Sequence, residues 1–155
     1  MLQVFDSWAG ELSPYQFESF ALPSVTRIST NLRRRLQEAG IPQVPLTLFA
    51  KGANTSLLAQ TKAGYDTLGL DWVIEPSEAR KIVGDGITLQ GNVDPNVLYG
   101  GRDAIEREVK RTCESFKGSK PTKAWIANLG HGITPGVDPE DMKWFLECVH
   151  KYSVS

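Results

Sequence analysis

The chain has 155 residues, of which 41% are hydrophobic and 23% are charged, and its formal net charge is -1. This composition predicts one globular domain with an apolar core, and the balanced charge argues against a protein that neutralises many nucleic-acid phosphates. No segment approaches the ~18 consecutive apolar residues of a membrane span, and the N-terminus, MLQVFDSWAGE, is not typical of a targeting peptide. We therefore expect a cytoplasmic protein with no nucleic-acid or membrane partner.

The first half of the chain alternates short apolar runs with helical patterns. A strand is predicted at residues 2–5, and Ser13 and Pro14 then open a helix with a capping-box glutamine. Pro23 is expected to interrupt that helix, and a second one, with apolar residues three and four apart, should end at Gly40. Further strands are predicted at residues 45–50 and 68–70, each followed by a short helix, at residues 55–62 and 75–83.

The second half continues the same alternation. A strand is predicted at residues 87–90, a long helix at 103–117 and a strand at 124–127. Asp138 and Pro139 should begin a final helix whose apolar face carries Met142, Phe145, Leu146 and Val149. Cys113 and Cys148, among apolar residues at helical spacing, are expected to be buried free thiols, which suits a reducing compartment.

This organisation amounts to five consecutive β-loop-α units. The strands read as apolar on both faces, as in a parallel sheet that helices cover. Both a doubly wound open sheet and part of a (β/α)8 barrel fit, but GxGxxG after the first strand and GxxxxGK[ST] are absent. A whole barrel needs about 250 residues, and the chain begins inside a strand. We therefore expect an incomplete TIM-type (β/α)8 barrel, with residues 1–155 forming about five βα units of its C-terminal part.

Polar side chains follow the predicted strands, where barrels and open α/β sheets carry their sites. The residues at these strand ends are Asp6, Ser7, Lys51, Asp71, Trp72, Asn92, Asp94 and His131. The set is more polar than loop caps require, so it predicts a ligand-binding rim. Simpler roles stay open: a turn cap for Ser7, a helix start for Asp94, loop-fixing hydrogen bonds for Asp71 and Asn92, and a solvated cation for Lys51.

His131 is the strongest candidate of this set. Gly130 and Gly132 flank it, and glycines let a backbone approach a ligand and adopt unusual dihedral angles. A hydrolase triad with Ser7 is not supported, because GxSxG is missing. A zinc site is not expected either, since the nearest other histidine, His150, belongs to the final helix. The basic run 33–35 is interpreted as a solvated helix end on the opposite face of the barrel.

Four strand-end segments resemble uroporphyrinogen decarboxylase, in that family's order. They are FDSWAGELSP at residues 5–14, GLDW at 69–72, TLQGNVDP at 88–95 and NLGHGITPGVDPE at 128–140. LTLFAKG at residues 46–52 also matches. The resemblance runs from one end of the chain to the other, and it is specific because each segment is a loop motif and not a packing pattern.

The resemblance implies a carboxy-lyase of haem and porphyrin biosynthesis that acts without cofactor or metal. The family removes carbon dioxide from the four acetate side chains of uroporphyrinogen, giving coproporphyrinogen, and forms homodimers. Protonation of a pyrrole carbon makes the ring an electron sink, and a carboxylate stabilises the cationic intermediate. In this scheme Ser7 hydrogen-bonds one substrate carboxylate, and His131 binds another or helps proton transfer.

The chain departs from the family by lacking its N-terminal half, where the arginine-rich segment and the catalytic aspartate are expected. No catalytic residue is therefore assigned here, and the expected substrate-binding residues are Ser7 and His131. Two open sheet edges and an exposed interior are expected, with no activity from this chain alone. One alternative is a non-catalytic porphyrin-binding or regulatory half-barrel. Another is a methyl-transferring barrel of the same superfamily, whose zinc-binding His and Cys ligands are missing from the rim.

Overall fold

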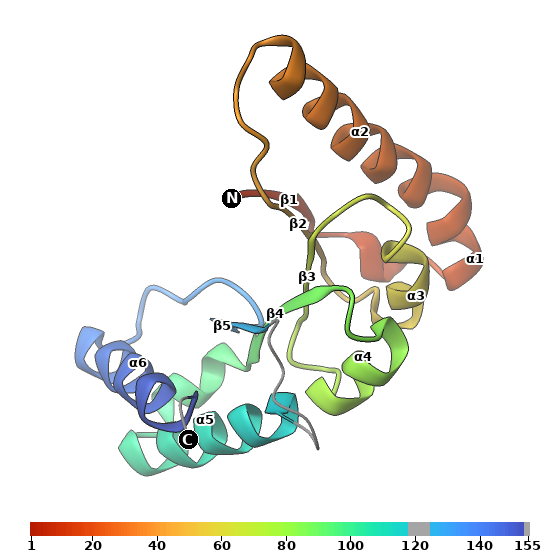
Figure 1. The fold of residues 1–155 in the computed structure, drawn as a ribbon. Coiled ribbons are helices and arrows are strands. Elements are labelled where there is room, and N and C mark those ends of the chain that lie inside the picture. The colour runs from red at the N-terminus through yellow and green to blue at the C-terminus, as the bar shows by residue number, and fades with distance from the viewer. Residues whose placement is uncertain (118–124, 154–155) are drawn as a thin grey trace.

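The computed structural model describes residues 1–117 and 125–153, which form a five-stranded parallel sheet with helices between successive strands (Figure 1). The strands are β1 (Leu2–Asp6), β2 (Leu46–Ala50), β3 (Thr67–Gly69), β4 (Thr88–Val93) and β5 (Trp125–Leu129). They lie in the sheet in chain order. A doubly wound sheet reverses its strand order at a switch point, so this order indicates part of an α/β barrel and confirms the predicted fold class.

The connecting helices vary widely in length. They are η1 (Ala9–Glu11), α1 (Pro14–Gln16), η2 (Phe17–Ala21), α2 (Leu22–Glu38), η3 (Asn54–Ser56), α3 (Leu57–Gln60), α4 (Pro76–Val83), η4 (Pro95–Tyr99), α5 (Arg102–Lys117) and α6 (Pro139–Ser153). The predicted capping box is confirmed, because Ser13 Oγ accepts from the Gln16 amide and Gln16 Oε1 accepts from the Ser13 amide. Residue 124 of the predicted fifth strand lies outside the described residues.

The predicted interruption at Pro23 is wrong. The chain stays helical from α1 through α2, and η2 between them is a π-helical turn. The wider turn lies directly before the proline, where an α-helix would bring the proline ring against the preceding turn. Pro23 falls in the first turn of α2, directly after this wider turn.

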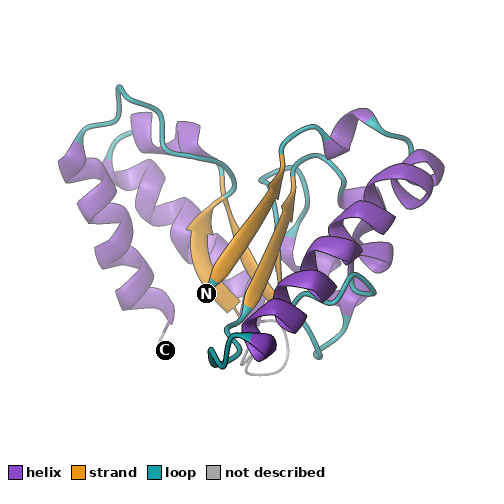
Figure 2. Ribbon diagram, turned by 90° about the horizontal axis from the view of Figure 1, so that it is seen from above, coloured by secondary structure: helices purple, strands orange, loops and turns teal. Residues whose placement is uncertain are grey.

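One face of the sheet is apolar and packs against the helices. The register aligns Val4, Leu48, Leu68, Leu89 and Trp125 across the five strands. These residues belong to or pack against a core that also includes Val25 of α2, Ala79 of α4 and Phe116 of α5. Figure 2 shows the strands in the centre with helices on either side.

A second core joins β4 and β5 to the two C-terminal helices. Cys113 and Cys148 are buried in it as free thiols, as predicted. Phe145 is also buried, but Leu146 is 48% exposed, so its assignment to the apolar face of α6 is wrong. Cys148 lies three residues after Phe145, on the same side of α6, and is buried in this core where Leu146 was expected.

The other face of the sheet is concave and partly polar. Gln90 of β4 donates from Nε2 to Gln3 Oε1 of β1 over 3.3 Å. These strands are three positions apart, about 14 Å on a flat sheet, so the sheet must curl toward this face for the two side chains to meet. Thr47 and Thr67 are also buried on this face. The prediction that the strands are apolar on both faces is therefore wrong here.

Within the described part of the chain, β1 and β5 each pair on one side only. Leu2 and Phe5 of β1 are 43% and 66% exposed, and Ile126 of β5 is 36% exposed. The sheet therefore has the two open edges and the exposed apolar side chains that the sequence predicted. None of the helices among the described residues combines the length and apolar character needed to cross a membrane.

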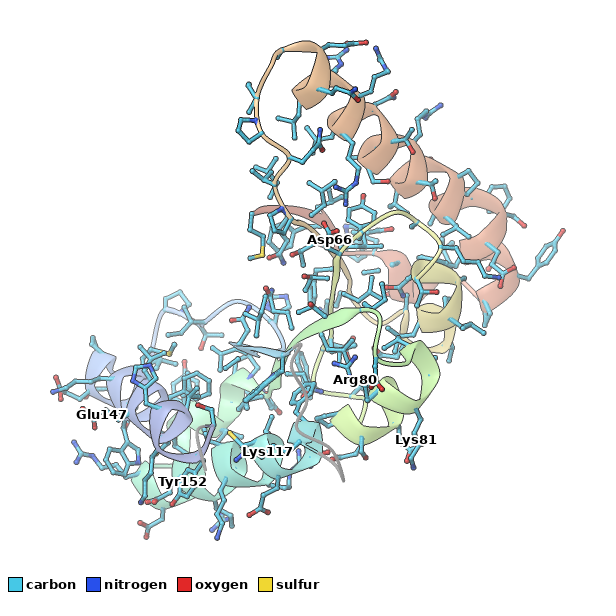
Figure 3. All side chains as sticks on the ribbon, in the orientation of Figure 1. Asp66, Arg80, Lys81, Lys117, Glu147 and Tyr152 are labelled. Atoms are coloured by element: carbon cyan, nitrogen blue, oxygen red, sulfur yellow. The ribbon has the colours of Figure 1, made fainter. Side chains whose placement is uncertain are left out.

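The basic run, residues 33–35, lies near the amino ends of the strands, opposite to the end where the predicted rim lies. Arg33 donates to the Gly64 carbonyl and pairs with Asp66 at 2.8 Å, and Arg34 pairs with Glu38 at 2.6 Å. Asp66, labelled in Figure 3, directly precedes β3 and so marks the amino ends of the strands. These contacts agree with the interpretation of the run as a solvated helix end on that face.

Candidate functional site

A cavity of about 280 Å³ extends from the concave face to the loop after β5. Its apolar lining includes Phe5, Phe49 and Ile133, and its amide lining is Gln3, Gln90 and Asn128. His131 is the one ionisable side chain among the described residues that line it. The cavity therefore offers an apolar body, neutral hydrogen-bonding groups and a single imidazole, and its described lining includes no Lys, Arg, Asp or Glu.

His131 directly follows the carboxyl end of β5 and is exposed. Its imidazole meets the indole of Trp72, in the loop after β3, edge to face, with 6.3 Å between ring centroids and 80° between planes. Edge-to-face packing is a favoured arrangement of aromatic rings. Trp72 therefore supports one side of the His131 ring.

Gly130 seats the His131 loop on the neighbouring backbone. Its N–H donates to the Val93 carbonyl over 2.7 Å. A Cβ atom at this position would lie 2.6 Å from the Trp72 nitrogen, whereas one at Gly132 would meet nothing within 4 Å. Neither glycine has a positive φ, so the prediction of unusual dihedral angles is wrong. Gly130 instead permits a close approach of protein backbone.

Asp71 is 3% exposed and fixes the loops after β2 and β3. Its Oδ2 accepts from the Gly52 N–H over 2.6 Å. Its Oδ1 accepts from Asn54 Nδ2 over 2.8 Å and from the Val73 N–H over 3.0 Å. The carboxylate is fully engaged by these donors, which confirms the loop-fixing role.

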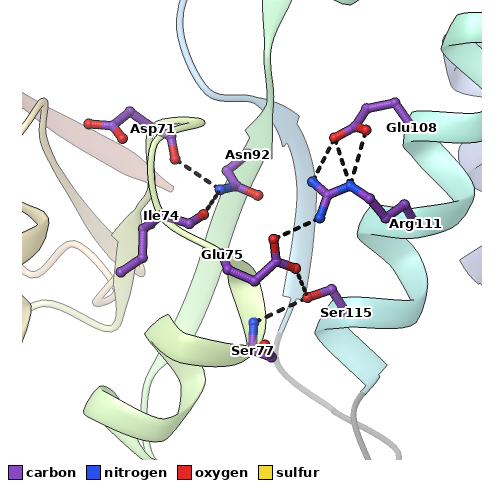
Figure 4. A network of polar contacts seen from close by, with 8 residues as sticks. All are labelled: Asp71, Ile74, Glu75, Ser77, Asn92, Glu108, Arg111 and Ser115. Carbon is purple, nitrogen blue, oxygen red and sulfur yellow. Dashed lines mark hydrogen bonds and ion pairs between the residues drawn. The ribbon is translucent and has the colours of Figure 1, made fainter.

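Asn92 of β4 holds the same loop from the other side (Figure 4). Its Nδ2 donates to the Asp71 carbonyl over 2.9 Å and to the Ile74 carbonyl over 2.7 Å, and the residue is 5% exposed. Asn92 is therefore also a loop-fixing residue. Asp71 and Asn92 together hold the loop after β3, which contains Trp72 and against which Gly130 packs.

The far end of this loop is tied to α5. Glu75 pairs with Arg111 at 2.7 Å and accepts from the Ser115 hydroxyl, while Arg111 also pairs with Glu108 (Figure 4). The Ser115 hydrogen bond and the Arg111 guanidinium lower the pKa of Glu75, although partial burial opposes them. The loop that presents Trp72 is thus restrained at both ends.

Asp94 starts a helix, as its simpler interpretation predicted. Its Oδ1 accepts from the Asn96 N–H over 2.9 Å and from Asn96 Nδ2 over 3.0 Å. This contact caps η4, which carries Tyr99 at its last position. Asp94 therefore serves as the N-cap of η4, and it is not among the described residues that line the cavity.

Ser7 and Lys51 follow β1 and β2. Ser7 is exposed in the turn, and the Lys51 N–H donates to the Asp6 carbonyl over 3.1 Å. Their loops touch through glycines, since a Cβ at Gly10 would lie 2.7 Å from the Gly52 Cα. Ser7 is not among the described residues lining the cavity. Ser7 follows β1 and His131 follows β5, so both lie where the strands end. β1 and β5 are the outer strands of the sheet, so the two residues lie on opposite sides of it.

Two aromatic residues contact the His131 loop, and neither was assigned a specific role from the sequence: Trp72 was expected at the rim, and Tyr99 was not singled out. Trp72 contacts the imidazole, and Tyr99 Oη lies 2.5 Å from the Thr134 hydroxyl in the loop after β5. Trp72 belongs to a strand-end segment, which is a signal for the site, but only the fold shows its partner. Among the described residues, no three His, Cys, Asp or Glu side chains gather into a possible metal site.

Comparison with known proteins identifies one family. The family model described as uroporphyrinogen decarboxylase (URO-D) matches residues 1–152. The uroporphyrinogen decarboxylase of Schizosaccharomyces pombe is 47% identical over 153 residues, covering 98% of this chain and 42% of that protein. Those of Homo sapiens and Dictyostelium discoideum are 43% and 44% identical, each covering 98% of this chain and 40% of the relative. The chain thus spans about two fifths of the length of these curated relatives.

A solved structure shares the fold at low sequence identity. A methyltransferase from Methanosarcina mazei superposes with a TM-score of 0.75 and 18% identity, covering 97% of this chain and 42% of that one. At this identity the likeness supports the partial barrel architecture alone, and it carries no argument for methyl transfer by this chain.

Proposed function

This chain belongs to the uroporphyrinogen decarboxylase family, and from that premise we propose that it forms one part of the substrate-binding rim of such an enzyme. The reaction is the decarboxylation of the four acetate side chains of uroporphyrinogen to give coproporphyrinogen. His131 and Ser7 each bind a substrate carboxylate in this proposal. The catalytic carboxylate and most of the cations come from the portion of the relatives that this chain does not cover.

The position of His131 is the observation that carries the proposal. The side chain is exposed, follows β5 at the carboxyl edge of the sheet and lines a cavity with apolar and amide walls. Such walls suit a macrocycle with an apolar body and pyrrole N–H groups, and an imidazolium suits a carboxylate. Ser7 adds an exposed hydroxyl at the same edge.

The first experiment measures binding of uroporphyrin, the stable oxidised form with eight carboxylates, by porphyrin fluorescence, with this chain co-expressed with the uncovered portion of a relative. His131→Ala should weaken binding about tenfold or more, because it removes a charge-assisted hydrogen bond. His150→Ala is the matched control, since His150 is exposed in the last turn of α6. Equal affinities for both variants would contradict the assignment of His131.

The second experiment separates an enzyme part from a non-catalytic porphyrin-binding half-barrel. We expect this chain alone to convert no uroporphyrinogen to coproporphyrinogen, measured by chromatography of the oxidised products. Co-expression with the uncovered portion of a relative should restore conversion if the chain is an enzyme part. Retained uroporphyrin binding without restored conversion would favour the non-catalytic alternative.

Two further expectations belong to the same proposal. Association into a homodimer is expected of the complete protein and is tested by sedimentation. A cytoplasmic location is consistent with two buried thiols that are not joined in a disulfide.

A further inference from the structure

The loop after β5 connects that strand to α6, and His131 lies near the start of this loop. One attachment lies directly before His131, where the Gly130 N–H donates to the Val93 carbonyl over 2.7 Å. A second lies three residues after it, where the Thr134 hydroxyl is 2.5 Å from Tyr99 Oη. His131 therefore lies between two points at which the loop is held.

The second attachment depends on Tyr99, the last residue of η4. A Cβ at Gly136 would lie 3.2 Å from Tyr99 Oη, so the loop passes over the phenol as well as bonding to it. The Val137 N–H donates to the Thr134 carbonyl over 3.2 Å and closes a turn at the same place. Tyr99 is 54% exposed, so its contact with the loop does not serve to fill a core.

We infer that Tyr99 is a positioning residue that holds His131 for ligand through the Thr134 hydroxyl. The inference rests on the proposed function of His131. His131, Gly132 and Ile133 are exposed between the two attachments, so the Trp72 contact would be left to orient the imidazole if the Thr134 attachment opened. Tyr99 does not line the cavity, so it acts through the loop and not on the ligand.

The test uses Tyr99→Phe and Thr134→Val, which remove one hydroxyl each from the same bond. Hydrogen exchange of the Val137 amide, which donates to the Thr134 carbonyl, should rise about two- to tenfold in each single variant, because one exposed hydrogen bond that holds this turn is lost. The double variant should exchange no faster than the singles, since both substitutions break one interaction. Tyr15→Phe is the matched control, because Tyr15 is 80% exposed in α1.

Uroporphyrin binding then distinguishes positioning from a general structural role. Tyr99→Phe should weaken binding about two- to tenfold in the native background and should have no further effect in a His131→Ala background. Equal weakening in both backgrounds, or faster exchange with unchanged binding, would overturn the inference. If the chain binds no uroporphyrin even when it is co-expressed with the uncovered portion of a relative, the proposed function fails. In that case unchanged exchange in Tyr99→Phe would still refute the restraint on the loop, and faster exchange would support it.

Discussion

Gly130→Ala tests how the His131 loop is seated on the neighbouring strands. The added Cβ would lie 2.6 Å from the Trp72 nitrogen, 3.0 Å from the Asp71 carbonyl carbon and 3.1 Å from the Asn92 carbonyl oxygen. All three are backbone atoms, so no side chain can rotate away. Relief requires the two loops to separate by several tenths of an ångström, against the hydrogen bonds that Asn92 and Gly130 make.

The expected cost follows from this overpacking. Forcing a methyl group into a packed site typically costs about 1–3 kcal/mol, and the lower entropy of an unfolded chain with alanine returns about 0.4–1 kcal/mol. With the middle of each range, the free energy of unfolding should therefore fall by about 1.3 kcal/mol. With a urea dependence of about 2 kcal/mol/M, the unfolding midpoint should fall by about 0.5–1 M.

The assay is urea unfolding followed by circular dichroism, with Gly132→Ala as the matched control. A Cβ at Gly132 meets nothing within 4 Å, and its φ is not positive, so this variant should keep the native stability or gain up to about 1 kcal/mol from the lower entropy of its unfolded chain. The two glycines flank the same histidine, so composition and position are closely matched. Identical unfolding midpoints for the two variants would refute the close approach of Gly130 to the Asp71–Trp72 backbone.

The remaining predictions concern Asp71 and Tyr65. Asp71→Asn should lower the free energy of unfolding by about 2 kcal/mol, because an amide NH2 group would face buried N–H donors. Asp94→Asn should cost less than about 1 kcal/mol, because its single accepting oxygen is kept. Equal losses in urea unfolding for the two variants would contradict this reasoning. Burial raises the pKa of Tyr65 to about 12, and its hydroxyl donates to the Val25 carbonyl over 2.9 Å. The unfolded chain releases this proton near pH 10, so the stabilising effect is complete below pH 10 and is lost as pH rises toward 12. Tyr65→Phe should flatten this alkaline decline in urea unfolding midpoints, and an unchanged slope would count against it.

Much of the fold could be predicted from the sequence because its signals are local. The alternation of apolar runs and helical patterns gave all five strands, and the capping box placed the start of α1 at Ser13. The helix through Pro23 could not be predicted, because the π-helical turn that accommodates the proline has no local signature. Leu146 and Cys148 are both apolar and near one helical face, and only the packing of α6 against α5 decides which is buried.

The polarity of the concave face was missed for a related reason. Gln3 and Gln90 lie 87 positions apart in the sequence, and their hydrogen bond exists only because the sheet curls. Short strands of five or six residues leave few alternating positions from which to recognise a mixed face. Curvature is a property of the whole sheet and is not contained in any one strand.

The rim itself was predictable, but the division of its roles was not. The carboxyl ends of parallel strands meet at one end of the sheet, so the position of Ser7 and His131 there could be predicted without knowledge of the fold, while their binding of substrate stays a prediction. Asp71 and Asn92 share the same kind of position, and a buried loop-fixing group has the same residue types as a ligand-binding one. Apart from the Val73 N–H, which donates to Asp71 from two residues away, their partners lie 17 to 21 residues away, at distances that the sequence does not specify.

The structure separates these polar groups by what each has left to offer a ligand. Asn92 donates twice to carbonyls of the loop after β3, so it cannot donate to a ligand carboxylate without releasing that loop. Asp71 is an acceptor that holds the loops after β2 and β3, and a carboxylate cannot bind another carboxylate. Ser7 and His131 are exposed, and the imidazole is the one ionisable group in the described cavity lining. A ligand with eight carboxylates needs several cations around it to offset desolvation. Under the proposed function, the cavity therefore requires cationic side chains from outside its described lining, and the relatives, more than twice as long as this chain, have the additional length to supply them.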